Sequence, residues 1–316
     1  MSRLGVMAVG VAAIVAIATP FFLKPFGIYL ITMWVVLTIA AIGLNLTLGY
    51  AGQVSLAQGA FVGIGAYSVA LLTQAGWPYP AAFAAAGALC FGIGWVLGYP
   101  ALRVQHHYLA FVTLAFTTLV FLVLRNEEWL THGIYGISGI SRPTMLGWST
   151  AKPRDFYFFS LGTLTMLAAA TWWMLRSPWG RAFVALRENP IRALSLGLDT
   201  RRYTLMAFAI GSSLGGLSGA LYAPLVQFIE PNSFALALSF NLLLMVIVGG
   251  AGRFFGPFLG AAVSVLLPEW LRFSEGLYLM LYAVFVMILL AFFPSGLLGL
   301  AERLRTSWPR SSKSAT

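Results

Sequence analysis

The residues that could carry out chemistry are few, and their spacing argues against an enzyme. The only lysines are Lys24, Lys152 and Lys313, and none follows a glycine, so the chain lacks a G-x-x-x-x-G-K-[ST] nucleotide-binding loop. The sequence also lacks H-E-x-x-H, paired Cys/His spacing and G-x-S-x-G. Cys90 is the only cysteine, which excludes an intrachain disulfide and a thiolate metal cluster. We therefore expect no catalytic residue, no metal and no cofactor in this chain.

The carboxylates are also placed unfavourably for ion-driven transport. Proton-coupled transporters and ion pumps generally carry Asp, Glu or His deep inside their membrane spans. Here six of the nine acidic residues fall in or near expected outer loops, namely Glu127, Glu128, Asp155, Glu230, Glu269 and Glu275. A stand-alone secondary transporter or channel stays open as an alternative from another class, and it would respond to an ion gradient.

The polar residues that do enter the apolar segments are neutral. Two explanations stay open: they line a path for a polar or zwitterionic solute, or they form hydrogen bonds between helices. The candidates for the translocation path are Asn45, Gln53, Ser55, Gln58 and Asn241. We expect the stretch Tyr50–Gln58 to line or border the path.

One polar stretch, Ser177–Arg202, has an apolar segment on both sides and is strongly basic. Against only Glu188 and Asp199 it carries five arginines: Arg181, Arg187, Arg192, Arg201 and Arg202. Because loops rich in lysine and arginine stay on the cytoplasmic side of a membrane, we expect this loop in the cytoplasm. That placement fixes the expected topology of the remaining chain.

A short helix is expected inside this loop, over Pro190–Leu196. Asn189 suits the N-cap, Pro190 the first helical position, and Gly197 a left-handed stop. Its apolar side chains share one face: Ile191, Leu194 and Leu198. A helix this short is not stable alone, so the apolar face either docks on a protein or belongs to a loop that only grips lipid headgroups.

The composition is that of a polytopic all-α membrane protein. The 316 residues are 59% hydrophobic and 9% charged, with a mean hydropathy of +0.86, against roughly a quarter charged in soluble domains. The net charge of +10 follows the expected topology, because 13 of the 19 lysines and arginines fall in inner segments and six in outer ones. We expect contact with membrane lipid and none with nucleic acid.

About ten spans fit this length, as a single transmembrane domain over 1–316 with both termini inside. An uncleaved first span ends near Leu23, and the long loop 126–155 lies outside. Five spans on each side of that loop permit an inverted repeat. The other expected spans are Gly27–Leu48, Gln53–Thr73, Pro78–Pro100, Tyr108–Leu124, Phe156–Leu175, Tyr203–Gln227, Phe240–Gly250, Pro257–Leu271 and Leu277–Phe293.

Glycines recur at four-residue spacing in three of these spans. Small residues let helices approach closely in lipid, where packing drives association. We expect close helix packing, rather than a ligand, at Gly59, Gly63, Gly211, Gly215, Gly219, Gly252, Gly256 and Gly260. Gly249 and Gly250 are expected to break a helix.

Three stretches resemble one family. They read GLNLTLGYAGQVSLAQGAFVGIGAY from Gly43, SPWGRAFVALRENPIRALSLGLDTRRY from Ser177 and LLLMVIVGGAGRFFGPFLGAA from Leu242. The chain resembles permease subunits of the high-affinity branched-chain amino-acid importers of the ATP-binding-cassette (ABC) class, of the LivM type. The same fold and loop also serve permeases for urea, short amides and small carboxylates. The resemblance therefore supports the type of transporter more strongly than the solute it carries.

The resemblance implies a larger assembly in the bacterial inner membrane. It implies a second, homologous permease, two cytoplasmic ATPase subunits that bind ATP and Mg, and an external substrate-binding protein. The cytoplasmic loop then couples to the ATPase, with an acidic residue followed by a glycine as its mark. The residues expected to make this coupling are Arg181, Glu188, Asn189, Pro190, Leu194 and Gly197.

Overall fold

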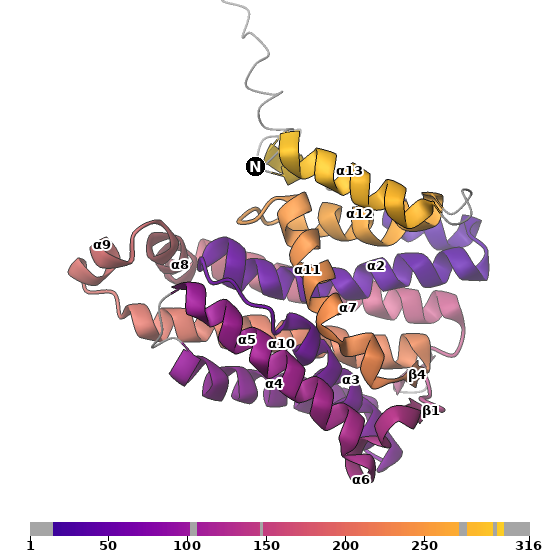
Figure 1. Ribbon diagram of the computed structural model, residues 1–316. Helices are drawn as coiled ribbons and strands as arrows, with labels where there is room; N and C mark the ends of the chain where they lie inside the picture. Colours follow the sequence, from indigo (N-terminus) through magenta and orange to yellow (C-terminus); the bar gives the residue numbers. More distant parts are fainter. Residues whose placement is uncertain (1–14, 102–105, 146–147, 272–276, 293–295, 300–316) are drawn as a thin grey trace, which may run out of the picture.

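A computed structural model describes residues 15–101, 106–145, 148–271, 277–292 and 296–299 (Figure 1). These residues are overwhelmingly helical, as the composition predicts. Residues 15–22 of the expected first span are helical. The start of that span, residues 1–14, and the basic tail, 300–316, lie outside the described residues.

Two mostly buried helices, α2 and α10, form the centre of the molecule. α2 (Pro25–Leu44) begins with proline at its first position and continues without a break into a π-helix, Asn45–Tyr50. α10 (Thr200–Val226) begins at Asp199, whose side chain accepts a hydrogen bond from the Arg202 amide. The two helices pack against each other along their length.

The other long helices surround this pair. α10 packs against α3 and α4, α2 packs against α7 and α12, and α11 packs against α12. α5 lies over α3, and α13 is at the edge beside α12 (Figure 1). Their bounds are α3 Gln58–Gln74, α4 Tyr79–Ala101, α5 His106–Asn126, α7 Pro153–Arg176, α11 Leu236–Gly249, α12 Gly256–Trp270 and α13 Tyr278–Phe292.

Short elements close one end of the bundle. β1 (Ile137–Ser138) pairs antiparallel with β4 (Phe228–Ile229), which ties the long loop after α5 to the end of α10. β2 (Thr144–Met145) pairs with β3 (Trp148–Ser149) within the same loop. One turn of α6 (Glu128–Thr131) and two 3-10 turns, Gly133–Tyr135 and Pro231–Phe234, complete this end.

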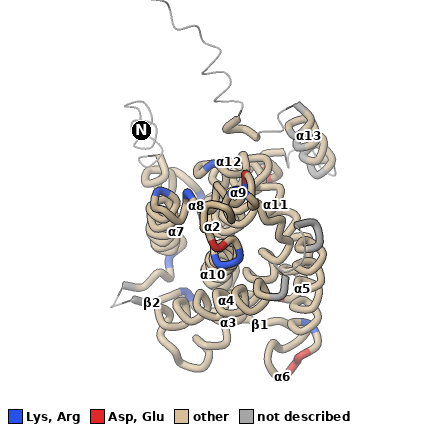
Figure 2. The backbone as a smooth tube through the Cα atoms, turned by 90° about the vertical axis from the view of Figure 1, so that its left-hand side faces the viewer, with Lys and Arg blue, Asp and Glu red and all other residues tan. Residues whose placement is uncertain are grey.

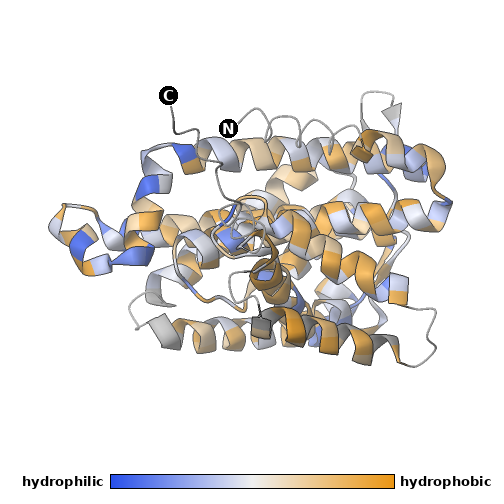
Figure 3. Cartoon of the chain, turned by 90° about the horizontal axis from the view of Figure 1, so that it is seen from above, coloured by the Kyte–Doolittle hydropathy of each residue, from blue (hydrophilic) through white to orange (hydrophobic). Residues whose placement is uncertain are grey.

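Two short helices, α8 (Pro178–Glu188) and α9 (Pro190–Ser195), project from the opposite end (Figure 1). Figure 2 faces that end and shows basic positions around α7, α8 and α10. Hydrophobic residues follow the length of the long helices, whereas the projecting end mixes hydrophilic and hydrophobic residues (Figure 3). The basic positions thus gather at the projecting end of an otherwise apolar bundle.

By length and composition, six described helices can cross a membrane. They are 25–50, 79–99, 109–126, 153–176, 200–226 and 231–249, and the helices α3, α12 and α13 are shorter. The chain is thus an all-α, multi-pass membrane protein. The count of ten spans, the inverted repeat and the single domain over 1–316 stay predictions.

Two expectations about the elements were wrong. The span expected from Gln53 begins at Gln58, because residues 51–57 are not helical. The basic loop was expected to hold one short helix, but it contains α8 as well, and α10 begins inside it at Thr200. The expected break at Gly249–Gly250 is present, since α11 ends at Gly249 and Gly250 has a φ of 112°.

Glycines lie where α10 meets α2 and α3. A Cβ added to Gly211 would lie 2.7 Å from the Gly43 carbonyl oxygen, and one on Gly215 would lie 2.9 Å from Gln58 Nε2. A Cβ on Gly219 would overlap the Val62 carbonyl oxygen. These helices therefore approach with backbone against backbone, the arrangement that small residues permit in lipid.

The other predicted packing glycines also face neighbouring backbone or side chains. A Cβ would lie 2.7 Å from Ser239 Oγ at Gly59 and 3.0 Å from Phe234 Cβ at Gly63. At Gly256 it would overlap the Gly250 carbonyl, and at Gly260 the Met245 carbonyl.

Candidate functional site

The helical hairpin α8–α9 is the first part of the candidate site. Ser177 Oγ accepts a hydrogen bond from the Trp179 amide at 3.2 Å and starts α8. Phe183 and Leu186 bury one face of α8, and Phe183 packs with Leu46 and Ala51 from the π-helix end of α2. α8 is therefore anchored on the membrane core.

α9 has the start and stop that its sequence predicts. Asn189 Oδ1 accepts a hydrogen bond from the Arg192 amide at 2.9 Å, and Pro190 is the first helical residue. After α9, Gly197 adopts a φ of +80°, and its amide donates to the Leu194 carbonyl at 2.9 Å. The left-handed glycine turns the chain back toward α10.

The apolar side chains of α9 are left in the open. Ile191 is 81% exposed, Leu194 62% and Leu196 80%, whereas Ala193 is buried. Leu198, which was expected to share the exposed face, is half-buried, and Leu196 is exposed in its place. A six-residue helix cannot hold such a surface alone in water.

Arg181 and Glu188 are also on the surface of this hairpin. Both line a shallow hollow of about 360 Å³ on α8, together with Val184 and Ala185. All six predicted coupling residues therefore lie on one projecting hairpin, three of them at its joint.

Four of the five neutral polar candidates, Asn45, Gln53, Ser55 and Gln58, are buried. Gln58 Nε2 donates to the Ala40 carbonyl at 2.9 Å and to the Gly211 carbonyl at 3.1 Å, which joins all three helices. Gln53 Nε2 donates to the Thr204 carbonyl at 3.0 Å. Ser55 Oγ accepts from the Ala57 amide at 3.2 Å. The bonds of Gln58 and Gln53 match the alternative of hydrogen bonding between helices, whereas the Ser55 bond is local.

Asn45 and Asn241 differ from one another. Asn45 is buried in the π-helix, and its amide bonds to the turn between α11 and α12. Asn241 is half-buried on α11. Asn241 is therefore separate from the polar cluster.

Residues 51–57 form a non-helical segment that joins the π-helix to α3. Non-helical backbone at membrane depth persists only where protein or a water-filled cavity surrounds it. Here α5 holds its Leu56 peptide: Thr113 Oγ1 accepts from the Leu56 amide at 3.0 Å, and Thr117 Oγ1 donates to the Leu56 carbonyl at 2.7 Å. Sequence reasoning missed both threonines, although their four-residue spacing in an apolar span was a usable signal.

Two features of this segment bear on its role: one exposed side chain and one unsatisfied buried oxygen. Val54 is 39% exposed while its neighbours Gln53 and Ser55 are buried. Gln53 Oε1 is buried and has no hydrogen-bond partner among the described residues. An unsatisfied buried oxygen of this kind is suited to accept a hydrogen bond from water or from a passing solute.

Replacement of Val54 by cysteine in a Cys90→Ala background tests whether this segment borders the path. Because Val54 is exposed and Ser55 is buried, we expect Val54→Cys to react with a small thiol reagent in the resting state and Ser55→Cys to be protected. Reaction at both positions should change in rate during ATP turnover. The measurement is the labelled fraction over time, and a Val54→Cys protein that is protected in every state would contradict the assignment.

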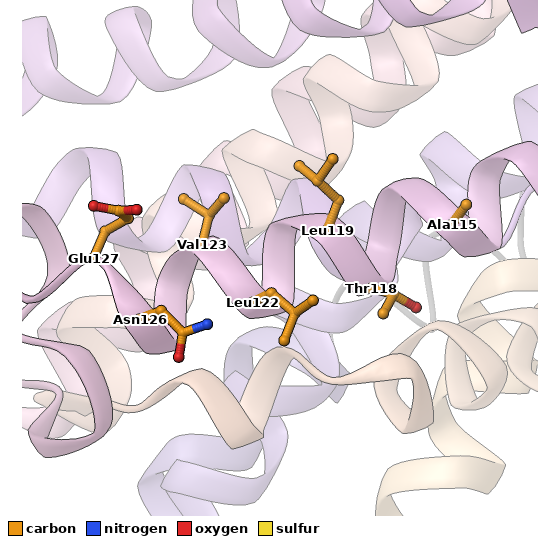
Figure 4. Close-up of a pocket in the computed structure, with 7 residues that line it drawn as sticks. All are labelled: Ala115, Thr118, Leu119, Leu122, Val123, Asn126 and Glu127. Atoms are coloured by element: carbon orange, nitrogen blue, oxygen red, sulfur yellow. The ribbon is translucent and has the colours of Figure 1, made fainter.

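α5 carries a second open surface, shown in Figure 4. A hollow of about 550 Å³ follows one side of this helix toward its C-terminal end and is lined by Ala115, Thr118, Leu119, Leu122, Val123, Asn126 and Glu127. A neighbouring groove of about 670 Å³ separates α5 from α3 and α4, with Ile64, Tyr67, Leu89, Phe116 and Val120 in its lining. α5 thus bonds to the non-helical segment on one side. Its other side is mainly apolar, with polar residues near its C-terminal end.

Residues 26–293 match the family model described as the permease component of the branched-chain amino acid transport system. The chain belongs to this family. The permease is 34% identical over 310 residues to the high-affinity branched-chain amino acid transport system permease protein LivM of Escherichia coli, covering 90% of this chain and 73% of that protein.

Other relatives carry different names. LivM of Salmonella typhimurium matches the permease with the same identity and coverage. The autoinducer 2 import system permease protein LsrC of Escherichia coli is 26% identical over 270 residues, which is 79% of this chain and 75% of LsrC. No solved structure matches the permease. Within the described residues, no group of three or more His, Cys, Asp or Glu side chains is placed to hold a metal ion.

Proposed function

We propose that the permease is the membrane-spanning subunit of an ABC importer for branched-chain amino acids. In this proposal it lies in the bacterial inner membrane with both termini in the cytoplasm. It pairs with a second, homologous permease, and an external binding protein delivers the solute. Two cytoplasmic ATPase subunits bind ATP and Mg and dock on the α8–α9 hairpin.

The observation that carries this proposal is the exposed apolar stripe of α9 on a basic, projecting hairpin. Leaving apolar surface in water costs about 25 cal/mol per Å². Two exposed arginines of the hairpin, Arg181 and Arg192, keep it out of the hydrocarbon, where each charged side chain costs about 2.5 to 3.5 kcal/mol. A groove on a partner protein satisfies both constraints, because a helix can lay its apolar face into it.

The substrate assignment rests on the family and on the named relatives. LivM of Escherichia coli is a branched-chain amino acid permease by its description, and LsrC belongs to an autoinducer 2 import system. Relatives with different cargo support a division of labour in which the binding protein sets most of the selectivity. Urea, amides and small carboxylates stay the alternatives for the same machine, and a stand-alone secondary transporter or channel is the alternative from another class.

Gly197 offers a test of the coupling role. Its φ of +80° strains a β-branched residue, although a Cβ there would meet nothing within 4 Å in the described part of the chain. Gly197→Val should therefore misalign α9 by backbone strain alone, with loss of substrate-stimulated ATP hydrolysis and of uptake in the reconstituted complex. Asparagine tolerates the left-handed region, so Gly197→Asn should keep most of both activities. A Gly197→Val complex with wild-type uptake would contradict the coupling role.

A further inference from the structure

The exposed residue Arg187 reaches from the hairpin to the π-helix at the end of α2. It is the second-last residue of α8, two positions before the Asn189 joint with α9. Its Nη1 donates a hydrogen bond to the carbonyl oxygen of Gly49 in the π-helix. The two residues are 138 positions apart in the sequence. A charged donor on a backbone carbonyl makes one of the stronger kinds of hydrogen bond.

Two glycines make room for this side chain, and a third, Gly49, lets the turn after α11 approach the π-helix. A Cβ on Gly52 would lie 3.2 Å from Arg187 Cγ, and a Cβ on Gly252 would overlap Arg187 Nη1. Both glycines have a positive φ, +71° and +78°. A Cβ on Gly49 would overlap the Gly252 amide. The left-handed turn after α2 thus contacts the aliphatic part of the Arg187 side chain, and the left-handed turn after α11 contacts its guanidinium group, while the residue as a whole stays exposed.

Asn45, at the start of the π-helix, also bonds to the turn between α11 and α12. Its Nδ2 donates to the Arg253 carbonyl at 3.0 Å, and its Oδ1 accepts from the Gly252 amide at 2.9 Å. Asn45 therefore fixes the turn between α11 and α12 against the π-helix, and Gly49, one helical turn on, receives Arg187. We call Arg187, Gly49, Asn45 and Gly252 the arginine tie.

The arginine tie lies directly before the non-helical segment. Gly52 follows the π-helix, and the chain then runs through Val54 to Leu56, whose peptide is held by Thr113 and Thr117. A displacement of α8 would thus be passed to the turn after α2, to the turn after α11 and onward to α5. π-helical turns are often found at functional positions inside helices.

We propose that Arg187 is the positioning residue that passes motion of the α8–α9 hairpin to the non-helical segment 51–57 and to the α11–α12 turn. This inference rests on the proposed docking of an ATPase on α9. Packing of Phe183 holds α8 in place without Arg187. Loss of the guanidinium group should therefore leave docking and hydrolysis intact and break their link to transport.

The test uses the complete complex, with Arg187→Gln, Arg187→Lys and the control Arg202→Gln. Arg202 belongs to the first turn of α10, with its side chain 83% exposed. We expect Arg187→Gln to retain ATPase subunits and hydrolysis while solute taken up per ATP hydrolysed falls by about tenfold, in line with the loss of one charge-assisted hydrogen bond. Arg187→Lys, which keeps a charged donor, should recover part of that ratio. Arg202→Gln should keep it unchanged.

Three results would overturn the inference. One is a wild-type ratio of uptake to hydrolysis in Arg187→Gln, and the second is an equal ratio in the Gln and Lys variants. The third is loss of hydrolysis and uptake together in both variants, which would make Arg187 part of the docking or of the fold. If Arg187→Gln does not assemble, the test rests on Arg187→Lys: a wild-type ratio of uptake to hydrolysis in that variant would then overturn the inference. Failure of the proposed function looks different, because ATPase subunits would then be missing from the wild-type complex itself.

Discussion

Replacing Gly219 by leucine should prevent the permease from assembling. A Cβ on Gly219 would overlap the Val62 carbonyl oxygen and lie 2.8 Å from the Ala66 amide, so the added side chain meets the backbone of α3. Backbone cannot rotate away as a side chain can, and we expect a cost of about 3 kcal/mol or more. The measurement is the yield of monodisperse permease after detergent extraction, together with its thermal midpoint.

Gly92 supplies the matched control for this prediction. It lies in α4, and a Cβ there would meet nothing within 4 Å in the described part of the chain. Gly92→Leu makes the same change in another long helix and should keep the wild-type yield. Equal yields for the two variants would show that close approach of α10 and α3 does not hold the bundle together.

Placing carboxylates on the exposed stripe of α9 should detach the ATPase. In Ile191→Asp with Leu194→Asp, the permease should insert and fold normally because both side chains are exposed. Docking would bury two unpaired charges, each of which costs several kcal/mol. We expect ATPase subunits to disappear from the purified complex. The volume-matched control Ile191→Leu with Leu194→Ile should retain them, since it preserves the apolar surface.

The sequence predicts the long helices well because their signal is strong. The expected spans 78–100 and 156–175 agree closely with α4, Tyr79–Ala101, and α7, Pro153–Arg176. Apolar length and proline at the first turn are local properties, and so are the cap at Asn189 and the stop at Gly197. Features that depend only on residues nearby in the sequence could therefore be predicted.

The features that distant segments create were not predictable in this way. The span was expected to begin at Gln53, but residues 53–57 are not helical, and the Leu56 peptide bonds instead to Thr113 and Thr117 in another helix. The arginine tie needs two glycine turns that meet only in the folded chain. α8 was missed because its arginines dominate a loop whose apolar face is seen only once Phe183 is known to be buried. Tertiary contacts decide all three.

The most direct test of the central claim is uptake of labelled leucine into proteoliposomes that contain the assembled complex, with ATP on the hairpin side. The account predicts uptake that needs ATP, the binding protein and the ATPase subunits, and that is lost in the Ile191→Asp, Leu194→Asp variant although this permease is present at wild-type level. Uptake by the permease in the absence of any ATPase, driven by an ion gradient, would contradict the account and establish a secondary transporter.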